Sequence, residues 1–266
     1  MKSIIKSALR AIGYEIRKTS GWPKPDGEPP RDEVIAGPWT YHVLQMANRN
    51  YRPPILRYHR TTYGEDHRLK YITYFLDVRD CRVLEIGPFE GHHSVLLEKM
   101  GVRENIAIES REDNLNKCRR IKEKYGLNQT TFVHHDLEKL YSGQETLHYC
   151  GQFDLVFCLG VLYHLPDPGK AIAWFRSQSS RLFLGTHYLE PEEVSDCIYI
   201  LAGKTYRAKE FREGGVEDPI SGMSPISLWF YEEDLIDMLK IAGYLSISVL
   251  GKDLQNGTPH ITIFAE

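Results

Sequence analysis

Residues 83–91 of this chain read Val83-Leu84-Glu85-Ile86-Gly87-Pro88-Phe89-Glu90-Gly91. Here an apolar run typical of a buried strand ends in two glycines, and a stretch with helical spacing follows. Gly87 allows a sharp turn after the strand, and Gly91 allows the backbone to come close to a ligand at a helix N-terminus. An ordinary tight turn has the same pattern, so its interpretation depends on the rest of the chain.

The pattern around this turn indicates the fold class. From Cys81 onward, short apolar or β-branched runs alternate with amphipathic stretches, which is typical of a parallel sheet with crossover helices. We expect strands over residues 82–87, 105–109, 131–135, 153–160 and 182–187, and helices over 93–100, 111–125 and 168–177. Farther on, we expect a helix over 231–242 and strands over 245–250 and 260–265, joined by a turn at Asn256-Gly257. The sequence therefore predicts an α/β fold with a Rossmann-like sheet.

Three stretches do not follow this alternation. Residues 1–20 place apolar side chains at helical spacing among lysines and arginines, which predicts a short basic amphipathic helix. Prolines and glycines between residues 21 and 30 indicate a linker, and the chain up to residue 76 reads as a helical extension. The alternation of strand and helix patterns also stops over residues 189–226. This stretch is too long for an ordinary connection and indicates a lid or substrate-shaping insertion. The predicted divisions are 1–76 for the extension, 77–188 for the core, 189–227 for the lid and 228–266 for the C-terminal part of the core.

The composition is that of a globular chain without a strong net charge. Of its 266 residues, 42% are hydrophobic and 26% are charged, which is enough for one sizeable core. The formal net charge of -3 disfavours wholesale binding to a nucleic-acid backbone. The five cysteines have no Cys-x-x-Cys spacing, so neither a disulfide framework nor a thiolate zinc site is expected.

The sequence also predicts where the protein resides. No apolar run reaches the ~20 residues that span a bilayer, and the start of the chain lacks the features of a secretory signal. We therefore expect a cytoplasmic protein. The basic helix over residues 1–20 is compatible with peripheral contact with the inner face of the membrane, although such helices more often pack on protein.

Two acids follow predicted strands at the edge where ligands bind in open α/β sheets. Glu109 ends the second strand, about 20 residues after the glycine turn, where an acid can accept hydrogen bonds from both hydroxyls of a ribose. Asp136 follows the third strand, where it can accept from the exocyclic amine of adenine. Either acid alone is an ordinary polar residue leaving a strand. Together they indicate a nucleoside ligand.

These residues, with the stretch from Phe153 to Pro168, resemble class I S-adenosylmethionine-dependent methyltransferases. The resemblance covers about residues 81–188 and the terminal helix and strand pair. It implies a seven-stranded sheet whose last strand is inserted antiparallel, and S-adenosyl-L-methionine as the cofactor. It assigns cofactor binding to Glu85, Gly87, Phe89, Gly91, Glu109, Ser110, Asp136, Leu137 and Gly160. Glu85 would anchor the amino group, the glycines would face the methionine part, and the Leu137 backbone would face adenine.

A nicotinamide dehydrogenase also uses a glycine turn and an acid on the second strand. This alternative fits less well, because Phe89 and Glu90 stand where the middle glycine of Gly-x-Gly-x-x-Gly would lie. Within the methyltransferases, Gly160 to His164 and Ser221 to Trp229 are similar to a bacterial group with Gly-x-x-Glu-Gly-x-His in the first motif. Known members of that group lie near glycan and natural-product modification.

The leading function is O-methylation of a small molecule or glycan, and two alternatives stay open. Tyr163-His164 also resembles tRNA wobble-uridine carboxymethyl transferases, in which that tyrosine helps to hold a carboxylated cofactor. The balanced charge disfavours tRNA as the partner. The other alternative is a non-catalytic binding subunit that keeps the fold. A homo-dimer is compatible with each of these functions.

The candidate catalytic residues are His164, His187 and Tyr163. A hydroxyl acceptor benefits from a base that titrates near neutral pH, and both histidines follow strands at the cofactor edge. Either histidine alternatively shapes the pocket by ordinary hydrogen bonding. The pairs His92-His93 and His134-His135 lack the carboxylate cluster that would complete a metal site, so no metal site is assigned. Many sugar methyltransferases use magnesium, so metal dependence stays open.

Overall fold

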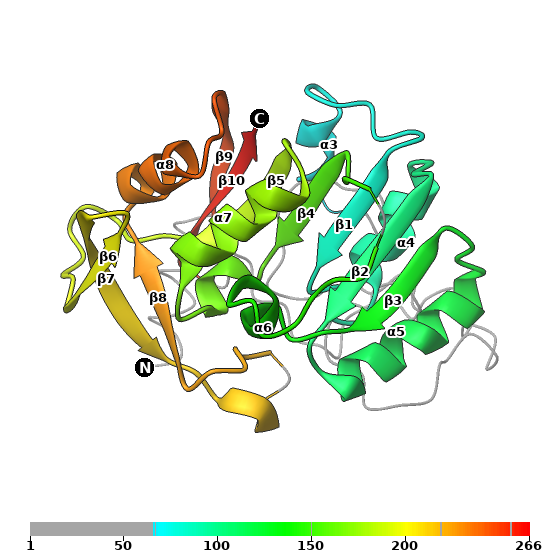
Figure 1. Cartoon of the computed structure of the whole chain (residues 1–266), viewed down its shortest axis with the longest axis horizontal. Helices are drawn as coiled ribbons and strands as arrows, with labels where there is room; N and C mark the ends of the chain where they lie inside the picture. The colour runs from blue at the N-terminus through cyan, green and yellow to red at the C-terminus, as the bar shows by residue number, and fades with distance from the viewer. Residues whose placement is uncertain (1–65, 67, 150, 219, 256) are drawn as a thin grey trace, which may run out of the picture. The chain divides into compact units, whose positions relative to one another are not determined.

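The computed structural model describes residues 66, 68–149, 151–218, 220–255 and 257–266. These residues form one seven-stranded sheet and one three-stranded sheet, with helices packed against them (Figure 1). The predicted basic helix over residues 1–20, the linker and most of the helical extension lie outside the described residues. No helix within the described part of the chain is long and apolar enough to cross a membrane.

The large sheet has the order β3-β2-β1-β4-β5-β10-β9. Its strands are β1 (Arg82–Ile86), β2 (Glu104–Glu109), β3 (Thr130–His134), β4 (Leu155–Leu159), β5 (Leu182–His187), β9 (Ile247–Gln255) and β10 (Thr258–Ala265). The first five strands pair in parallel, whereas β10 runs antiparallel to both β5 and β9. The predicted Rossmann-like sheet with its last strand inserted antiparallel is therefore confirmed.

Burial on both faces explains why the central strands read as continuous apolar runs. Every residue of β4 and of β5 is buried. Val83 and Leu84 are fully buried in different hydrophobic clusters, because successive side chains of a strand point to opposite faces of the sheet. The helices that cover these faces are α3 (Leu69–Ile72), α4 (His92–Lys99), α5 (Glu112–Tyr125), α6 (Leu137–Tyr141), α7 (Pro168–Gln178) and α8 (Glu232–Ile241).

The predicted lid is more regular than the sequence suggested. It contains β6 (Cys197–Leu201) and β7 (Lys204–Arg212), which pair antiparallel with each other, and β7 also pairs with β8 (Ile226–Phe230). Ala202 and Gly203 both have positive φ, as the tight hairpin between β6 and β7 requires. The prediction of irregular structure was wrong here, because β6 turns apolar side chains outward and so blurs the alternation.

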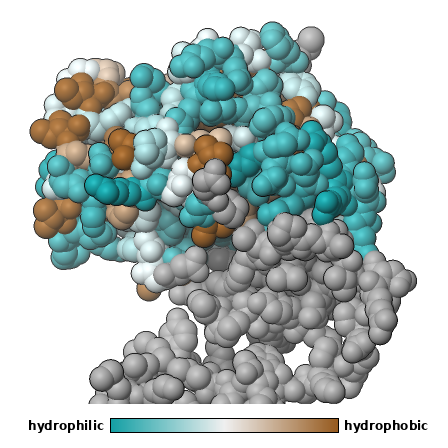
Figure 2. Space-filling model, turned by 90° about the horizontal axis from the view of Figure 1, so that it is seen from below, coloured by the Kyte–Doolittle hydropathy of each residue, from teal (hydrophilic) through white to brown (hydrophobic). Residues whose placement is uncertain are grey.

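The small sheet packs against the core through its buried face. Tyr206, Ala208 and Phe230 belong to the same hydrophobic cluster as residues of α7 and α8, and the three strands stand beside these helices in Figure 1. On the opposite face, Ile198 and Ile200 are 71% and 67% exposed. The hydrophobic atoms at the left of Figure 2 lie over this sheet. β8 crosses the predicted boundary at residue 227 and pairs with β7 of the small sheet.

Candidate active site

The turn after β1 has the backbone conformation that its glycines predicted. Gly87 and Gly91 have φ of 66° and 83°, and Phe89 between them has φ of 57°. A Cβ added to Gly87 would lie 2.4 Å from Cγ2 of Val161, so the turn packs tightly against the segment that follows β4. A side chain at position 87 would therefore cause both backbone strain and a steric clash.

Phe89 holds a conformation that non-glycine residues rarely adopt, at a cost of about 1 kcal/mol or more. Neighbouring groups fix it: the Phe89 N–H donates to Oε2 of Glu109 at 3.1 Å, and the Cys118 thiol donates to the Phe89 carbonyl. The adjacent Glu90 carboxylate is fully buried and lies 3.3 Å from Nζ of Lys117 on α5. The shape of the turn thus depends on α5 as well as on the glycines.

Glu109 ends β2 with a buried carboxylate. One oxygen accepts from Phe89 N–H, and the other accepts from Arg111 N–H at 2.9 Å. Burial is the largest influence and raises the pKa of Glu109 to about 7, although both N–H groups act in the opposite direction. A carboxylate has about four lone-pair positions, and the Asn114 side chain also hydrogen-bonds Glu109, so one position is left for a further donor. This acceptor fits a hydroxyl of a ribose.

The ends of β2 and β3 are tied together beside Glu109. The Ser110 hydroxyl donates to the His135 carbonyl at 3.2 Å, and His135 N–H donates to the Glu109 carbonyl at 3.3 Å. Asp136 caps the short helix α6, because its Oδ1 accepts from Glu138 N–H at 2.9 Å. The sequence did not predict this capping role, and Leu137 is the first residue of the capped helix.

Glu85 lies deeper than the other predicted residues. Its Oε2 accepts from the Ser94 hydroxyl at 2.6 Å and from the Asn105 side-chain amide at 2.7 Å. Burial raises the pKa of Glu85. Its Oε1 is buried and accepts no hydrogen bond from the described residues, which suits an acceptor for a further donor such as an amino group.

Beyond β4, the structure brings Gly160 and the three predicted catalytic residues together. Tyr163 lies in a short helix, η3 (Leu162–His164), and its ring centroid is 4.2 Å from both the His164 ring and the His187 ring. Its hydroxyl oxygen lies 3.7 Å from where a Cβ of Gly160 would be. Burial raises the pKa of Tyr163 to about 12, so the phenol is neutral at physiological pH.

The two histidines are oriented by different partners. Nδ1 of His187 lies 2.9 Å from the Pro259 carbonyl, which can only accept, so His187 donates from Nδ1. Burial lowers the pKa of His187. Nδ1 of His164 instead lies 3.0 Å from Oε2 of Glu213. In both residues this contact leaves Nε2 as the nitrogen that can accept a proton.

Glu213 follows β7 and was not among the predicted residues. Burial opposes its charge, but hydrogen bonds from His164, the Gly222 N–H and the Ser221 hydroxyl outweigh burial and lower the pKa of Glu213 to about 2. It is therefore a carboxylate at any ordinary pH. The contact joins residues 49 positions apart, across a connection whose mixed sequence carries no local signal for it.

Trp229 joins the small sheet to this cluster. Its Nε1 donates to the Tyr163 carbonyl at 2.8 Å. Its ring stacks on Phe211 with a centroid distance of 4.0 Å and on His187 with a centroid distance of 4.9 Å. The indole is thus held between two rings, as a wall beside the histidines.

The histidine pairs considered for metal binding contact other groups. Nε2 of His93 lies 2.9 Å from Asp66, and Nδ1 of His135 lies 3.0 Å from Glu145. Across the described ranges, no group of three or more histidine, cysteine, aspartate or glutamate side chains is arranged to hold a metal ion.

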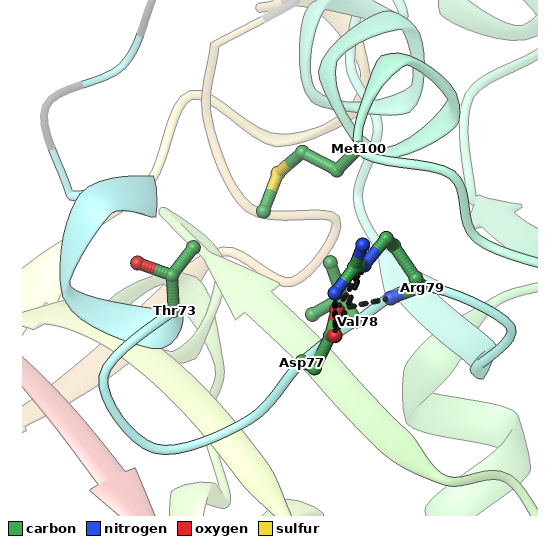
Figure 3. A pocket seen from close by; sticks show the side chains of 5 residues that line it. All are labelled: Thr73, Asp77, Val78, Arg79 and Met100. Carbon is green, nitrogen blue, oxygen red and sulfur yellow. Dashed lines mark hydrogen bonds and ion pairs between the residues drawn. The ribbon is translucent and has the colours of Figure 1, made fainter.

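A hollow lies at the other edge of the sheet, where β1 begins and α4 ends (Figure 3). It is lined by Thr73, Asp77, Val78, Arg79 and Met100. Asp77 and Arg79 form an exposed ion pair there. The hollow contains none of the predicted site residues, and we assign no ligand to it.

The sheet order, the glycine turn and the acids that end β2 and precede α6 together define the S-adenosylmethionine-dependent methyltransferase class. Residues 77–193 match the family described as a methyltransferase domain. The sequence-based assignment to that class is confirmed.

Two kinds of similar protein bear on the function. The N-terminal domain of EvdMO1 with SAH bound is 26% identical, with a TM-score of 0.63 over 76% of this chain and 81% of that one. The same domain in the presence of SAH and D-fucose is also 26% identical, with a TM-score of 0.62 over 77% of this chain and 85% of that one. A tRNA U34 carboxymethyltransferase of Campylobacter hominis is 27% identical over 127 residues, which cover 45% of this chain. That match spans 40% of the curated relative's length.

Proposed function

We propose that this protein binds S-adenosyl-L-methionine at the carboxyl edge of its large sheet and methylates a hydroxyl of a sugar or another small molecule. One observation carries the proposal of O-methylation: a histidine hydrogen-bonded to a carboxylate, His164 with Glu213, lies next to Tyr163 and Gly160. A hydroxyl must lose its proton during methylation, and such a pair is suited to accept it.

In this proposal the residues that would hold the cofactor stand at the ends of β1, β2, β3 and β4. Glu109 and Ser110 hold the ribose, Asp136 and the Leu137 backbone hold adenine, and Glu85 takes the amino group. Gly87, Phe89, Gly91 and Gly160 face the methionine part. Bound S-adenosylmethionine supplies a methyl group on a positively charged sulfur, which makes that carbon open to direct attack. The protein's main task is then to align the acceptor and exclude water.

His164 is the proposed base. Its Nε2 would take the proton of the acceptor hydroxyl as that oxygen receives the methyl group that bound S-adenosylmethionine would supply. The negative charge of Glu213 stabilises the imidazolium that results. His187 is less suited to this role, because burial disfavours its charged form and its Nδ1 donates to a neutral carbonyl. Tyr163, kept neutral by burial, positions groups near the methyl carbon by hydrogen bonding.

A sugar-like acceptor has support from the small sheet and from one similar structure. The insertion contributes Trp229 and Phe211 beside the histidines, and aromatic rings of this kind can line a site for a sugar. The EvdMO1 domain has been crystallised in the presence of D-fucose. We therefore retain the lid role of residues 189–227 as part of the proposal.

One alternative has a specific observation in its favour. The similar tRNA U34 carboxymethyltransferase, together with Tyr163-His164, favours tRNA modification with a carboxylated cofactor. The net charge of -3 argues against it, because tRNA binding calls for a contiguous basic surface. A homo-dimer and peripheral membrane contact through residues 1–20 stay predictions. The exposed Ile198 and Ile200 are compatible with the former.

The test combines binding with turnover. We expect titration calorimetry of the full chain to show S-adenosylhomocysteine binding at micromolar dissociation constants, a range typical of cofactors. We expect radiolabelled methyl transfer to deoxysugars or their nucleotide conjugates, with transfer RNA as a parallel substrate. Label in RNA alone would select the tRNA alternative. Absence of cofactor binding would select the non-catalytic alternative.

Cofactor affinity should depend on pH through Glu109. Its pKa of about 7 lies above the ordinary 4.5, so the carboxyl is protonated below pH 7 and ionised above it. Ribose hydroxyls donate to the ionised form, so binding expels the proton. We expect the dissociation constant of S-adenosylhomocysteine to fall about tenfold per pH unit between pH 5.5 and 6.5 and to level off near pH 8.

Glu109→Gln provides the matched control for this pH dependence. The amide has no proton to lose in this range, so the variant should bind weakly and with little dependence on pH. If the variant kept the full pH dependence, another group would be responsible and the ribose assignment would fail.

A further inference from the structure

The connection between β7 and β8 contacts both the proposed base and the ribose side of the cofactor site. We call its described part, residues 213–218 and 220–222, the positioning loop. Glu213 at its start accepts hydrogen bonds from His164 and, through Oε2, from Gly222 N–H at 2.6 Å and from the Ser221 hydroxyl. The far end of the loop therefore holds the Glu213 carboxylate, which contacts the proposed base.

At Gly222 the loop backbone packs closely against the main chain of His164. A Cβ added to Gly222 would lie 2.4 Å from the His164 carbonyl oxygen and 3.2 Å from Cγ of Glu213. No larger residue fits without moving the loop. The Glu213 side chain is 8% exposed and that of His164 is 22% exposed, so the pair is partly shielded from water while the imidazole stays accessible. Shielding strengthens the attraction within such a pair.

Arg111 ties the same loop to the cofactor side. Its guanidinium donates to four main-chain carbonyls, those of Gly215, Val216, Ser221 and Gly222, at 2.9, 2.6, 2.6 and 3.1 Å. Its own N–H donates to Oε1 of Glu109. A continuous set of hydrogen bonds thus runs from Glu109 through Arg111 and the positioning loop to Glu213 and His164.

We propose that Glu213 is a positioning residue that holds His164 in the tautomer and orientation of a base, and that Arg111 fixes the positioning loop relative to the bound nucleoside. This inference rests on the proposed function, in which His164 is the base. It adds that the orientation of the base is not fixed by η3, the helix to which His164 belongs. A loop from the small sheet orients the base, and Arg111 anchors that loop to the large sheet.

A double-mutant cycle tests the role of Glu213. We expect Glu213→Gln to lower kcat about 10- to 100-fold, with the KM for acceptor and the affinity for S-adenosylhomocysteine within about threefold of the parent protein. In a His164→Gln background, the same substitution should cost less than about threefold, because the residue through which it acts is gone. Equal losses in both backgrounds would mean that Glu213 acts by stabilising the fold, and the inference would be wrong.

Glu193→Gln is the matched control for this cycle. Glu193 is also a partly buried carboxylate of the insertion, but it contacts Lys209 and the Glu190 N–H and no histidine. We expect its kcat to stay within about twofold of the parent. A loss as large as that of Glu213→Gln would show that any disturbance of the insertion lowers the rate, which would overturn the specific role of Glu213.

Arg111→Lys separates the loop from the cofactor. Lysine keeps the positive charge near Glu109 and the backbone N–H, but its compact ammonium cannot reach four carbonyls in the geometry of a guanidinium. We expect kcat to fall about three- to tenfold while affinity for S-adenosylhomocysteine stays within about threefold. If affinity fell as much as kcat, Arg111 would act on the cofactor alone, and its role in the loop would be rejected.

A readout without turnover keeps this inference separate from the proposed function. Nitrogen NMR of the imidazoles should show His164 protonated at Nδ1 in the parent and a mixture of tautomers in Glu213→Ala. An unchanged tautomer would reject the positioning role even if methyl transfer occurs. A parent protein that binds S-adenosylhomocysteine but methylates no acceptor would instead contradict the proposed function and leave the tautomer result to stand.

Discussion

His164→Gln is expected to lower kcat for methyl transfer by about 10²- to 10⁴-fold, the range typical of a lost general base. Glutamine can still hydrogen-bond Glu213, so the positioning loop should keep its path. It cannot accept the proton of a hydroxyl. Affinity for S-adenosylhomocysteine should change little, because His164 contacts Glu213 and Tyr163 and not Glu109, the proposed ribose-binding residue. Steady-state transfer of radiolabel, together with calorimetry, measures both quantities.

His187→Gln is the comparison that identifies the base. His187 lies as close to Tyr163 as His164 does, with the same centroid distance of 4.2 Å. We expect a loss of kcat no larger than about tenfold, because its Nδ1 contacts a neutral carbonyl and burial lowers its pKa. If His187→Gln lost more activity than His164→Gln, the roles assigned to the two histidines would have to be exchanged.

Lys117→Met is expected to lower the free energy of unfolding by about 3 to 5 kcal/mol, the cost of breaking a buried ion pair by removing one partner. Lys117 and Glu90 lie 3.3 Å apart, with side chains 10% and 0% exposed. The substitution removes a charged partner from a fully buried carboxylate, and such a loss costs free energy. Urea unfolding at 25 °C measures the change, and cofactor affinity should fall too because Glu90 lies in the turn after β1.

Arg119→Ala on the same helix α5 is the control for this measurement. Arg119 pairs with Glu112, but both side chains are about half exposed. Water screens such pairs, so the expected change is within about 0.5 kcal/mol. Equal effects from the two substitutions would show that the Glu90–Lys117 pair contributes no more than a surface contact, and our account of the turn would be incorrect.

The large sheet was predictable because its strands are buried on both faces. Burial leaves runs such as 155–159 without a polar residue, and glycine and acidic residues mark where the strands end. The parallel order then brings Gly87, Glu109 and Gly160 to one edge without any further information. For the same reason, Tyr163, His164 and His187 were identifiable as neighbours, since each follows a central strand.

The partners of these residues were not predictable, because they come from segments distant in sequence. Glu213 reaches His164 from the small sheet, and Arg111 binds carbonyl oxygens, which leave no mark on the sequence. The small sheet itself was hidden because β6 exposes Ile198 and Ile200 while β7 buries Tyr206 and Ala208 among charged neighbours. The order of apolar and polar residues in these strands depends on tertiary packing, which cannot be read from a single sequence.

The four carbonyls around Arg111 carry a consequence for engineering this protein. Every amino acid has a main-chain carbonyl, so these four hydrogen bonds depend on the path of the loop backbone and not on the side chains of the loop. Val216 and Ile220 are 65% and 62% exposed, so changing their side chains should leave the four hydrogen bonds in place. Adding or deleting a single residue between Gly214 and Ser221 would shift the carbonyls out of reach, so natural variation here should change composition far more readily than length.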